Sequence, residues 1–494
     1  MTKTYGPKDL AIALPLLLTP PLWGLTPDFI GPAILLLSAG VCFFLTCYPE
    51  RAAAGKNYLP LACAAVCLLL LALSWWTLST LKEQALIISV CLLYGVTLQR
   101  LCNQRQRRLI AYAIICGALL IALLALNIPL LIDNDKIDYI AMANPNILSL
   151  HLALCLPLGI RLCLQNKHPA ERVFLAAICV ILVITLFYKR SLGCAVALAT
   201  GLSLFMPLPL TPRVRTALRC AAILAMVTVS YPFLNPKSTK MADRVYWQRQ
   251  GYSIFKQRPL LGNAERGGFM ARYPARRELQ RPRINTTSTH NIFLQWLCDW
   301  GLAGTLALLM VLMILLPRYR HLKQDWSLQA MLTVAVIGGL WDSGLQMLPN
   351  LLVFCGLLGT SATVHGPARS KLTDKATIAS IAILTLAASM QIVIARYHTL
   401  LGARYLTATA SDLRALEKAD SRFKRAVAWE PTNFQSWIDL SVTQALECRD
   451  DLLACDKAVI ARRKACALMP NHDLLWHDLK RFLVFRDKMY TGSP

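Results

Sequence analysis

The residues best suited to chemistry lie in one strongly basic segment, from about Asn235 to His290. Twelve basic and three acidic side chains give this segment a formal charge of about +9. Nine of the twelve are arginines, and the planar guanidinium matches phosphate oxygens better than a lysine ammonium does. We expect the segment to hold an anion. Two sources stay open, a phosphate-bearing substrate or the anionic headgroups of a membrane.

A histidine and an asparagine close this segment. His290 and Asn291 stand in the stretch STHNIFLQWLCDWGLAG, where a polar loop turns into an apolar run. An imidazole titrates near neutral pH and can take a proton from a hydroxyl group. The alternative is an ordinary polar residue at the start of a helix, and the histidine alone does not decide between the two.

The elements that must position these residues are apolar. Of the 494 residues, 56% are apolar and 16% are charged, and the mean hydropathy is +0.47. Soluble domains carry about 25% charged residues. Runs of about 20 apolar residues, enough to cross a bilayer as a helix, occur about thirteen times, at about 9–25, 29–48, 58–78, 84–100, 109–131, 146–164, 171–187, 192–208, 217–234, 291–316, 327–346, 350–365 and 377–398. The predicted fold class is an all-α polytopic membrane protein of about 12–13 transmembrane helices.

The cations of the short loops fall mainly on one side. With the N-terminus in the cytoplasm, about twenty lie in cytoplasmic loops, and about four lie in the opposite short loops, namely Lys82, Lys136, Lys189 and Arg190. Cytoplasmic loops retain Lys and Arg, so this asymmetry explains the net charge of +25 without nucleic-acid binding. The same count places residues 235–290 and the C-terminal tail on the far side. The tail changes sides if the count is wrong by one helix.

The tail, residues 401–494, contains an internal repeat. Ala, Pro, Trp, Asp and Leu residues recur at an offset of about 39, in KRAVAWEPTNFQSWIDLS and in RRKACALMPNHDLLWHDLK. Helical arrays repeat roughly every 34 to 45 residues, and the two stretches resemble tetratricopeptide repeats. We predict a small helical domain that follows a membrane domain of residues 1–400, with a plain helical hairpin as the alternative. Cys448 and Cys455 flank a polar turn and can pair if the tail lies in an oxidising compartment.

The other cysteines predict no metal centre. Most of the 17 lie in apolar spans, where a thiol behaves as a small apolar group. No CxxC pair or Cys/His cluster has the spacing of a zinc site. We expect no metal and no cofactor.

The basic loop resembles the O-antigen ligase and O-antigen polymerase superfamily. The segment DRVYWQRQGYSIFKQRPLLGNAERGGF is similar to the family's Arg-x-x-Trp and PLxGxGxGxF patterns, with Arg244 and Trp247 at the first of these. STHNIFLQWLCDWGLAG is similar to HNxxLQxLxExGxxG, with His290 and Asn291 at its start. Asp299 stands where a glutamate is common in the family.

The resemblance extends on both sides of the loop and covers residues 140 to 360 or so. Upstream, ANPNILSLHLALCLPL contains Asn146, and YKRSLGCAVAL places Arg190 where the family usually has Ser-Arg-Gly. Downstream, WDSGLQMLPNLLVFCGLLG places Asp342 near the end of an expected span, where the family has an acid.

This resemblance implies an enzyme. The family consists of polytopic glycosyltransferases of the bacterial inner membrane that take a glycan from undecaprenyl diphosphate at the periplasmic face, without nucleotide sugar or metal. The implied function is transfer of the glycan to lipid A core or a similar acceptor, and the implied partners are the lipid-linked donor, that acceptor and the bilayer. Polymerisation of a polysaccharide and transfer of an oligosaccharide to a protein hydroxyl are the alternatives within this class.

The matched positions imply roles for single residues. His290 is expected to activate the acceptor, and Arg190 and Arg244 are expected to hold the diphosphate. Charge develops on the departing diphosphate, and preorganised cations in a low-dielectric pocket stabilise it. Further substrate contacts are expected from Arg266, Arg272, Asn291, Asn146 and Asp342.

Two classes of protein without this chemistry fit the sequence less well. In a transporter, charged residues inside the membrane line a path and the two halves share a pattern. Here the charges fall in loops and the halves show no obvious repeat. A membrane-anchored scaffold for the tail needs only one helix, and about thirteen spans are too many for an anchor.

The cation count predicts the topology. Reporter fusions at Arg107 and at Lys167 should report the cytoplasm, and a fusion after Asn263 should report the far side of the membrane. A cytoplasmic signal from the Asn263 fusion would contradict an enzyme that uses exported lipid-linked glycans.

Overall fold

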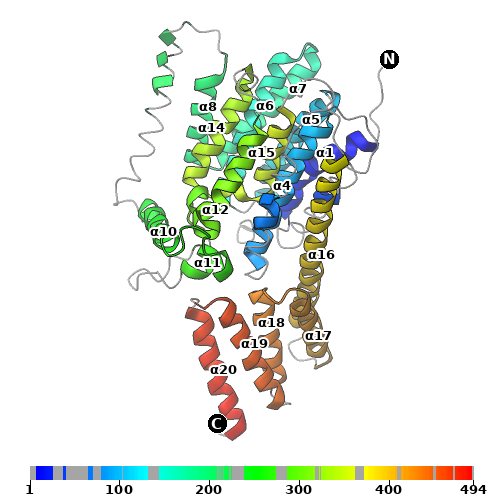
Figure 1. Ribbon diagram of the computed structural model, residues 1–494, viewed down its shortest axis with the longest axis vertical. Helices are drawn as coiled ribbons and strands as arrows, with labels where there is room; N and C mark the ends of the chain where they lie inside the picture. The colour runs from blue at the N-terminus through cyan, green and yellow to red at the C-terminus, as the bar shows by residue number, and fades with distance from the viewer. Residues whose placement is uncertain are drawn as a thin grey trace.

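A computed structural model describes residues 7–25, 37–40, 65–70, 79–102, 104–131, 144–207, 239–273, 286, 288–316, 322, 324–361, 372–408, 413–448, 452–470 and 473–491, with single residues and short pieces between 211 and 224. The secondary structure in these ranges is helical throughout (Figure 1). The helices form a bundle, with a group of shorter helices at one end of it.

Six described helices are long and apolar enough to cross a membrane. They are α4 (Ser79–Leu101), α5 (Gln104–Leu131), α6 (Pro145–Gln165), α7 (Pro169–Tyr188), α12 (Ile292–Leu315) and α16 (Leu372–Ala408). Four further apolar helices stand among them: α1 (Pro7–Leu25), α8 (Leu192–Phe205), α14 (Trp326–Trp341) and α15 (Leu348–Ser361). The chain is an all-α polytopic membrane protein, as predicted.

The ten helices correspond to ten of the thirteen predicted spans. The other three, at 29–48, 58–78 and 217–234, lie mostly outside the described residues. The largest difference concerns the last span, which was predicted over 377–398. The helix α16 runs from Leu372 to Ala408 and carries the chain out of the bundle toward the tail (Figure 1).

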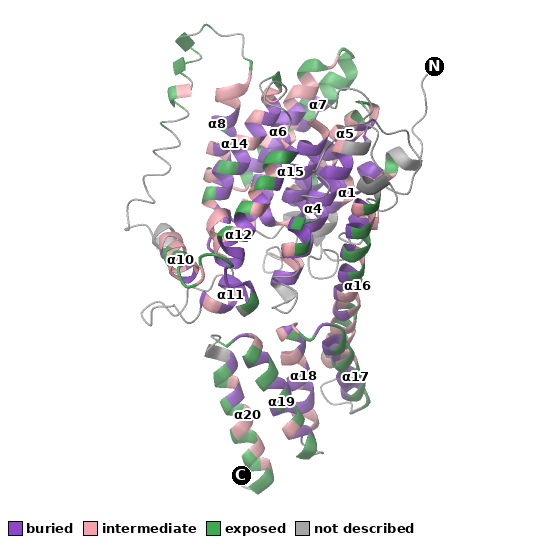
Figure 2. Ribbon diagram, in the orientation of Figure 1, coloured by how far each residue is buried: buried purple, intermediate pink, exposed green. Residues whose placement is uncertain are grey.

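The outer faces of the bundle are apolar where a soluble protein would be polar. On α7, the side chains of Val173, Phe174, Val180, Ile184 and Phe187 are all more than half exposed, and the buried residues fill the interior of the bundle (Figure 2). Exposed apolar side chains at this density are stable in lipid and unfavourable in water. The bundle therefore requires a bilayer around it.

Glycines let the innermost helices approach closely. A Cβ atom added to Gly359 of α15 would lie 2.3 Å from the carbonyl oxygen of Gly95 in α4. Small residues allow backbone contact between membrane helices, because packing rather than the hydrophobic effect holds such helices together. This contact fixes α15, and the turn that precedes it, against the bundle.

The basic loop folds into short helices at the end of the bundle. It contains α10 (Thr239–Phe255), the 3-10 turn η2 (Ala264–Arg266) and α11 (Gly268–Arg272), and it leads into α12. Figure 1 shows α10 and α11 at the same end of the molecule as the tail.

The tail forms two consecutive helical hairpins. Its helices are α17 (Leu413–Trp429), α18 (Phe434–Glu447), α19 (Leu452–Leu468) and α20 (Asp473–Thr491), so each helix of the second pair starts 39 residues after its counterpart. The indole N–H of Trp437 donates to the carbonyl of Pro431 at 2.8 Å, and that of Trp476 donates to Pro470 at 2.8 Å. The repeat in the sequence is therefore a repeat in the structure.

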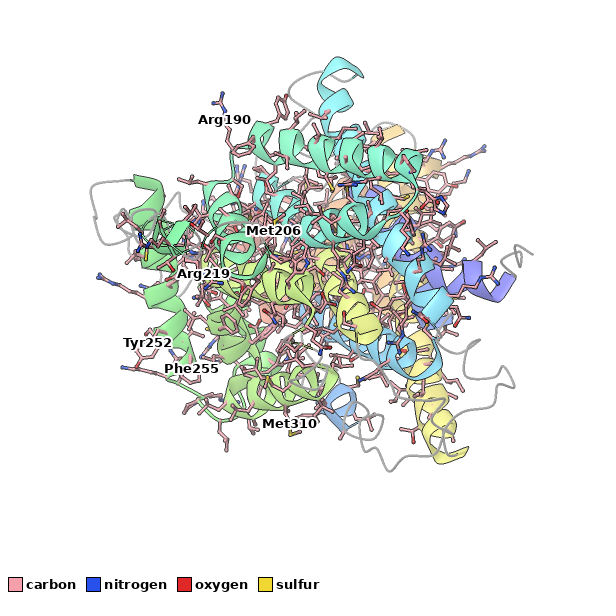
Figure 3. The ribbon with its side chains drawn as sticks, turned by 90° about the horizontal axis from the view of Figure 1, so that it is seen from above. Arg190, Met206, Arg219, Tyr252, Phe255 and Met310 are labelled. Atoms are coloured by element: carbon pink, nitrogen blue, oxygen red, sulfur yellow. A yellow bond between two sulfur atoms is a disulfide. The ribbon has the colours of Figure 1, made fainter. Side chains whose placement is uncertain are left out.

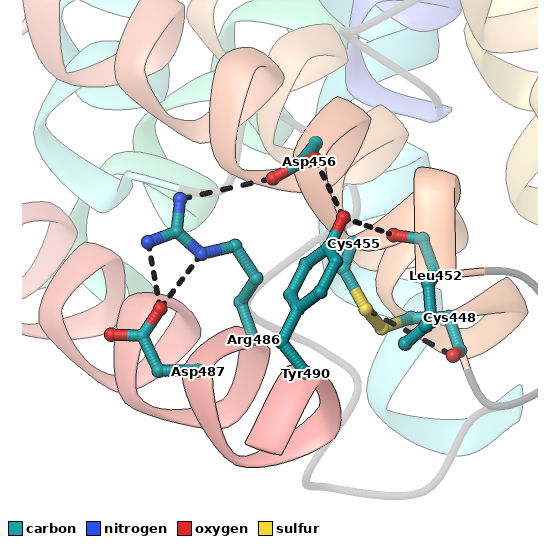
Figure 4. Close-up of a disulfide and its surroundings, with 7 residues drawn as sticks. All are labelled: Cys448, Leu452, Cys455, Asp456, Arg486, Asp487 and Tyr490. Atoms are coloured by element: carbon teal, nitrogen blue, oxygen red, sulfur yellow. Dashed lines mark hydrogen bonds and ion pairs between the residues drawn. A yellow bond between two sulfur atoms is a disulfide. The ribbon is translucent and has the colours of Figure 1, made fainter. Parts of the chain in front are cut away.

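The predicted disulfide between Cys448 and Cys455 is present (Figure 4). It joins the end of α18 to the first turn of α19. Next to it, the hydroxyl of Tyr490 in α20 donates to Asp456 of α19 at 2.8 Å. The disulfide and this hydrogen bond hold the ends of three tail helices together.

Candidate active site

The candidate site is built around the carboxylate of Asp342. This buried residue follows the last residue of α14, and the chain then turns into η4 (Gly344–Gln346). Its Oδ2 atom accepts a hydrogen bond from Asn146 Nδ2 at 3.1 Å and lies 3.7 Å from both Arg244 Nη2 and His290 Nδ1. One oxygen atom thus joins α6, α10 and the segment that enters α12.

Asn146 is held in one orientation by its neighbours. It stands in the first turn of α6, whose N-cap is Asn144, and its own N–H donates to the Asn144 side chain at 2.9 Å. The hydroxyl of Ser191, which precedes α8, donates to Asn146 Oδ1 at 2.9 Å. The amide oxygen is therefore engaged by Ser191, and the amide nitrogen is directed to Asp342.

Arg244 brings a cation to the end of α14. Its Nη1 donates to the carbonyl of Trp341 at 3.2 Å, and its Nη2 lies at ion-pair distance from Asp342. A cation is favourable where a helix ends, because the last carbonyl groups carry partial negative charge. The guanidinium has five N–H donors, so these two contacts leave donors for a substrate oxygen.

His290 is held from several sides in a rare backbone conformation. Its φ is +52°, in the left-handed region, which non-glycine residues seldom adopt outside constrained sites. The ring stacks on Trp247 with a centroid distance of 4.6 Å. With Nδ1 toward Asp342, Nε2 lies 3.3 Å from the hydroxyl oxygen of Thr286.

These contacts prepare His290 to act as a base. A carboxylate beside Nδ1 favours the tautomer that carries its proton there, and Nε2 then has a free electron pair. The Thr286 hydroxyl donates its proton to the Ser288 carbonyl at 2.8 Å, but the position of its oxygen, 3.3 Å from Nε2, shows that an alcohol oxygen can reach this atom. The arrangement can therefore take a proton from a hydroxyl group.

The charges in the cluster stabilise the ionised acid. Burial raises the pKa of the Asp342 carboxyl, but its interactions with His290 and Arg244 and the N–H of Ser343 outweigh burial, so the pKa lies below its usual range. The acid is an anion at neutral pH and can stabilise a positive charge on the imidazole.

Arg190 lies beside the cluster in sequence, but its side chain points elsewhere. It follows Lys189, the C-cap of α7, with φ at +53° in the left-handed region, and it directly precedes Ser191. Figure 3 shows the Arg190 side chain pointing outward from the edge of the bundle. The guanidinium is exposed and, among the described residues, has no ion-pair partner. It is available to an incoming anion.

The other predicted substrate residues are not gathered at Asp342. Asn291 caps α12, because its side-chain oxygen accepts from Leu294 N–H at 3.1 Å. Arg272 ends α11, where its guanidinium donates to Gln257 at 3.1 Å. The side chain of Arg266 lies outside the described residues. In the described part of the chain, no group of three His, Cys, Asp or Glu side chains is placed to hold a metal ion.

Comparison with known proteins gives one family match. A family model described as O-antigen ligase matches residues 173–309. Over these residues the chain is similar to the O-antigen ligase and polymerase superfamily, which supports the resemblance read from the sequence. The O-antigen ligase match includes Arg190, Ser191, Arg244, Trp247 and His290. No match was found among curated proteins.

Asn146 and Asp342 lie outside the O-antigen ligase match, yet the structure brings Asp342 to His290 and Asn146 to Asp342. They complete the cluster from α6 and from the end of α14.

Several residues of the candidate site were not assigned roles from the sequence. Trp247 stacks on the imidazole, Ser191 orients Asn146, and the Ser343 hydroxyl donates to that of Ser288 at 3.0 Å. Trp247 belongs to the Arg-x-x-Trp pattern with Arg244, while Ser191 and Ser343 directly follow Arg190 and Asp342 in the sequence. Ser288 carried no signal, because a short polar side chain has no pattern of its own.

The ionised acid predicts a pH-dependent stability. Replacing Asp342 by Asn should lower the free energy of unfolding by at least about 1 kcal/mol at pH 7, because His290 and Arg244 lose their counter-charge. A carboxyl whose pKa is lowered by folding stabilises above its unfolded pKa, near 3.9, and this contribution is lost as the pH falls through the lower folded value. The melting temperatures of the parent protein and the D342N variant, measured from pH 7 to pH 3, should therefore converge toward the lowest pH.

The control for this comparison is Asp487→Asn. Asp487 is an exposed acid in the tail that pairs with Arg486, so its loss should change stability little. Equal stability of the D342N variant and the parent at pH 7 would contradict the ion-pair account.

Proposed function

We propose that the chain is a membrane glycosyltransferase that moves a glycan from undecaprenyl diphosphate to an acceptor hydroxyl on the periplasmic face of a bacterial inner membrane. The O-antigen ligase match supports a membrane protein of this type. One observation carries the proposal: the Asp342 carboxylate holds an imidazole and a guanidinium together. A base for a hydroxyl and a cation for a phosphate are thereby neighbours.

The transfer step uses this arrangement directly. The acceptor oxygen attacks the anomeric carbon of the donor sugar, and its proton passes to Nε2 of His290. The bond between that carbon and the diphosphate oxygen breaks, and its electron pair leaves on the diphosphate. Arg244 and Arg190 stabilise the charge that develops there, while Asp342 stabilises the imidazolium.

The proposed acceptor is lipid A core or a similar glycolipid. A growing polysaccharide or a protein hydroxyl would use the same step. Reconstituted protein with one defined undecaprenyl-diphosphate glycan and each of the three acceptors separates these outcomes. Transfer to the glycolipid alone is the expected result.

Replacement of His290 tests the base. Because φ at this position is +52°, asparagine is the better substitution, since it tolerates the left-handed region. The His290→Asn variant should fold and bind the lipid-linked donor, and its transfer rate should fall by about 100- to 10,000-fold. The control is His477→Asn in the tail, on an exposed residue, which should transfer at the parent rate. Parent-like transfer by the H290N variant across pH 6 to 8 or so, where an imidazole titrates, would rule out this role.

Replacement of Arg190 tests the proposed diphosphate contact. Because its guanidinium is exposed and has no ion-pair partner among the described residues, Arg190→Ala should leave the melting temperature unchanged. The donor KM should rise by about 10- to 100-fold, the loss expected for a charged hydrogen bond. Arg190→Lys should recover only part of this, because an ammonium is a point charge. Lys189→Ala is the adjacent control, and equal donor KM values for the R190A variant and the parent would exclude the contact.

A further inference from the structure

A second chain of polar contacts approaches His290 from the side of α11. The backbone N–H of Thr289 donates to Gln295 Oε1 at 2.8 Å, and Gln295 Nε2 donates to Asp299 Oδ2 at 2.8 Å. The N–H of Phe269 in α11 donates to Asp299 Oδ1 at 2.9 Å. All four residues are buried, so water does not compete for these hydrogen bonds.

The donors and acceptors in this chain of hydrogen bonds point in one direction. Gln295 accepts at one end of its amide and donates at the other, while Asp299 accepts at both of its oxygens. Each group is satisfied in only one arrangement, because a carboxylate cannot donate. The position of α11 is therefore linked to the position of Thr289, the residue directly before His290.

The backbone of the basic loop packs directly against this chain of hydrogen bonds. A Cβ atom added to Gly268, where φ is +62°, would lie 2.3 Å from Asp299 Oδ1. A Cβ atom on Gly251 of α10 would lie 2.7 Å from Cγ2 of Thr289. Only glycine permits these approaches, so the loop and the first turns of α12 form one closely packed unit.

The opposite side of α11 is held by the tail. Met270 and Ala271 share an apolar cluster with side chains of α18, α19 and α20, namely Phe434, Ile438, Val459, Cys466, Leu468, Met469, Leu475, Leu479, Phe482 and Leu483. α11 is thus enclosed between Asp299 on one side and the tail on the other. Figure 1 shows α11 directly above α19 and α20.

We propose that Gln295 and Asp299 are positioning residues for His290, and that the tail holds the outer end of the same chain through α11. His290 adopts a strained conformation and needs fixed neighbours to keep its imidazole at Asp342. Thr289, on one side of His290, is fixed by Gln295, and Asn291, on the other side, is fixed as the cap of α12. The proposal rests on the proposed function, because it requires His290 to act in transfer.

A polarity swap, in which the amide and the carboxylate exchange positions, tests this chain of hydrogen bonds. In the Asp299→Asn variant, the amide N–H group of residue 299 faces that of Gln295. In the Gln295→Glu variant, the carboxylate of residue 295 faces that of Asp299. In the double variant, a glutamate at 295 accepts from Thr289 and from the asparagine at 299, which still accepts from Phe269. Each single variant should therefore lower the rate of transfer at saturating donor by about 10- to 100-fold, the effect of misplacing a reacting group. The double variant should recover most of that rate.

The tail supplies a matched control for this swap. Gln435 Nε2 donates to Asp439 Oδ1 at 2.9 Å with the same four-residue spacing, and Gln435 is exposed while Asp439 is partly buried. Gln435→Glu, Asp439→Asn and their double variant should all transfer at the parent rate. Parent-like transfer by the D299N and Q295E variants would overturn the proposal. A double variant that regains the parent melting temperature and stays as slow as the single variants would also overturn it.

Substitutions in the full-length protein test the contact between α11 and the tail. Met270→Ser should lower transfer at saturating donor with no change in donor KM, whereas Leu260→Ser, in an exposed part of the same loop, should not. Equal rates for the two variants would remove the tail from the proposal. If the H290N variant transfers normally, the proposed function itself fails; if the H290N variant is inactive and the swap variants are active, only the present inference fails.

Discussion

The site depends on one buried carboxylate at the end of a helix. Removing a charge from water is unfavourable unless other groups compensate, and Asp342 is compensated by the Asn146 amide, the Arg244 guanidinium and the His290 imidazole. These partners come from three elements that are far apart in the sequence. The need to satisfy this acid therefore fixes how the basic loop sits on the bundle.

The arginines in and near the basic loop are of two kinds. Some cations have internal partners: Arg244 is paired with Asp342, and Arg258 is paired with Glu265. Arg190 has no such partner among the described residues and points outward. The proposed diphosphate site would thus have one cation fixed at the base and another exposed at the edge, an arrangement that suits binding and release.

The sequence predicted most of the architecture and only part of the site. Length and hydropathy predicted the helices of the bundle, and an offset of 39 residues predicted the two tail hairpins. The grouping of Asn146, Asp342, Arg244 and His290 followed from resemblance, since no periodicity relates positions so far apart. The stacking of Trp247, the outward direction of the Arg190 side chain and the contact of α11 with the tail depend on packing in three dimensions.

Asp342 and His290 are proposed to act as one unit, and a double-mutant cycle measures the coupling between them. Transfer rates of D342N, H290N and the double variant should be compared in the reconstituted system with the same donor and acceptor. Residues that act as a unit have strongly non-additive effects, so the double variant should be no slower than the slower single variant. A double variant whose loss equals the product of the two single losses would contradict the claim.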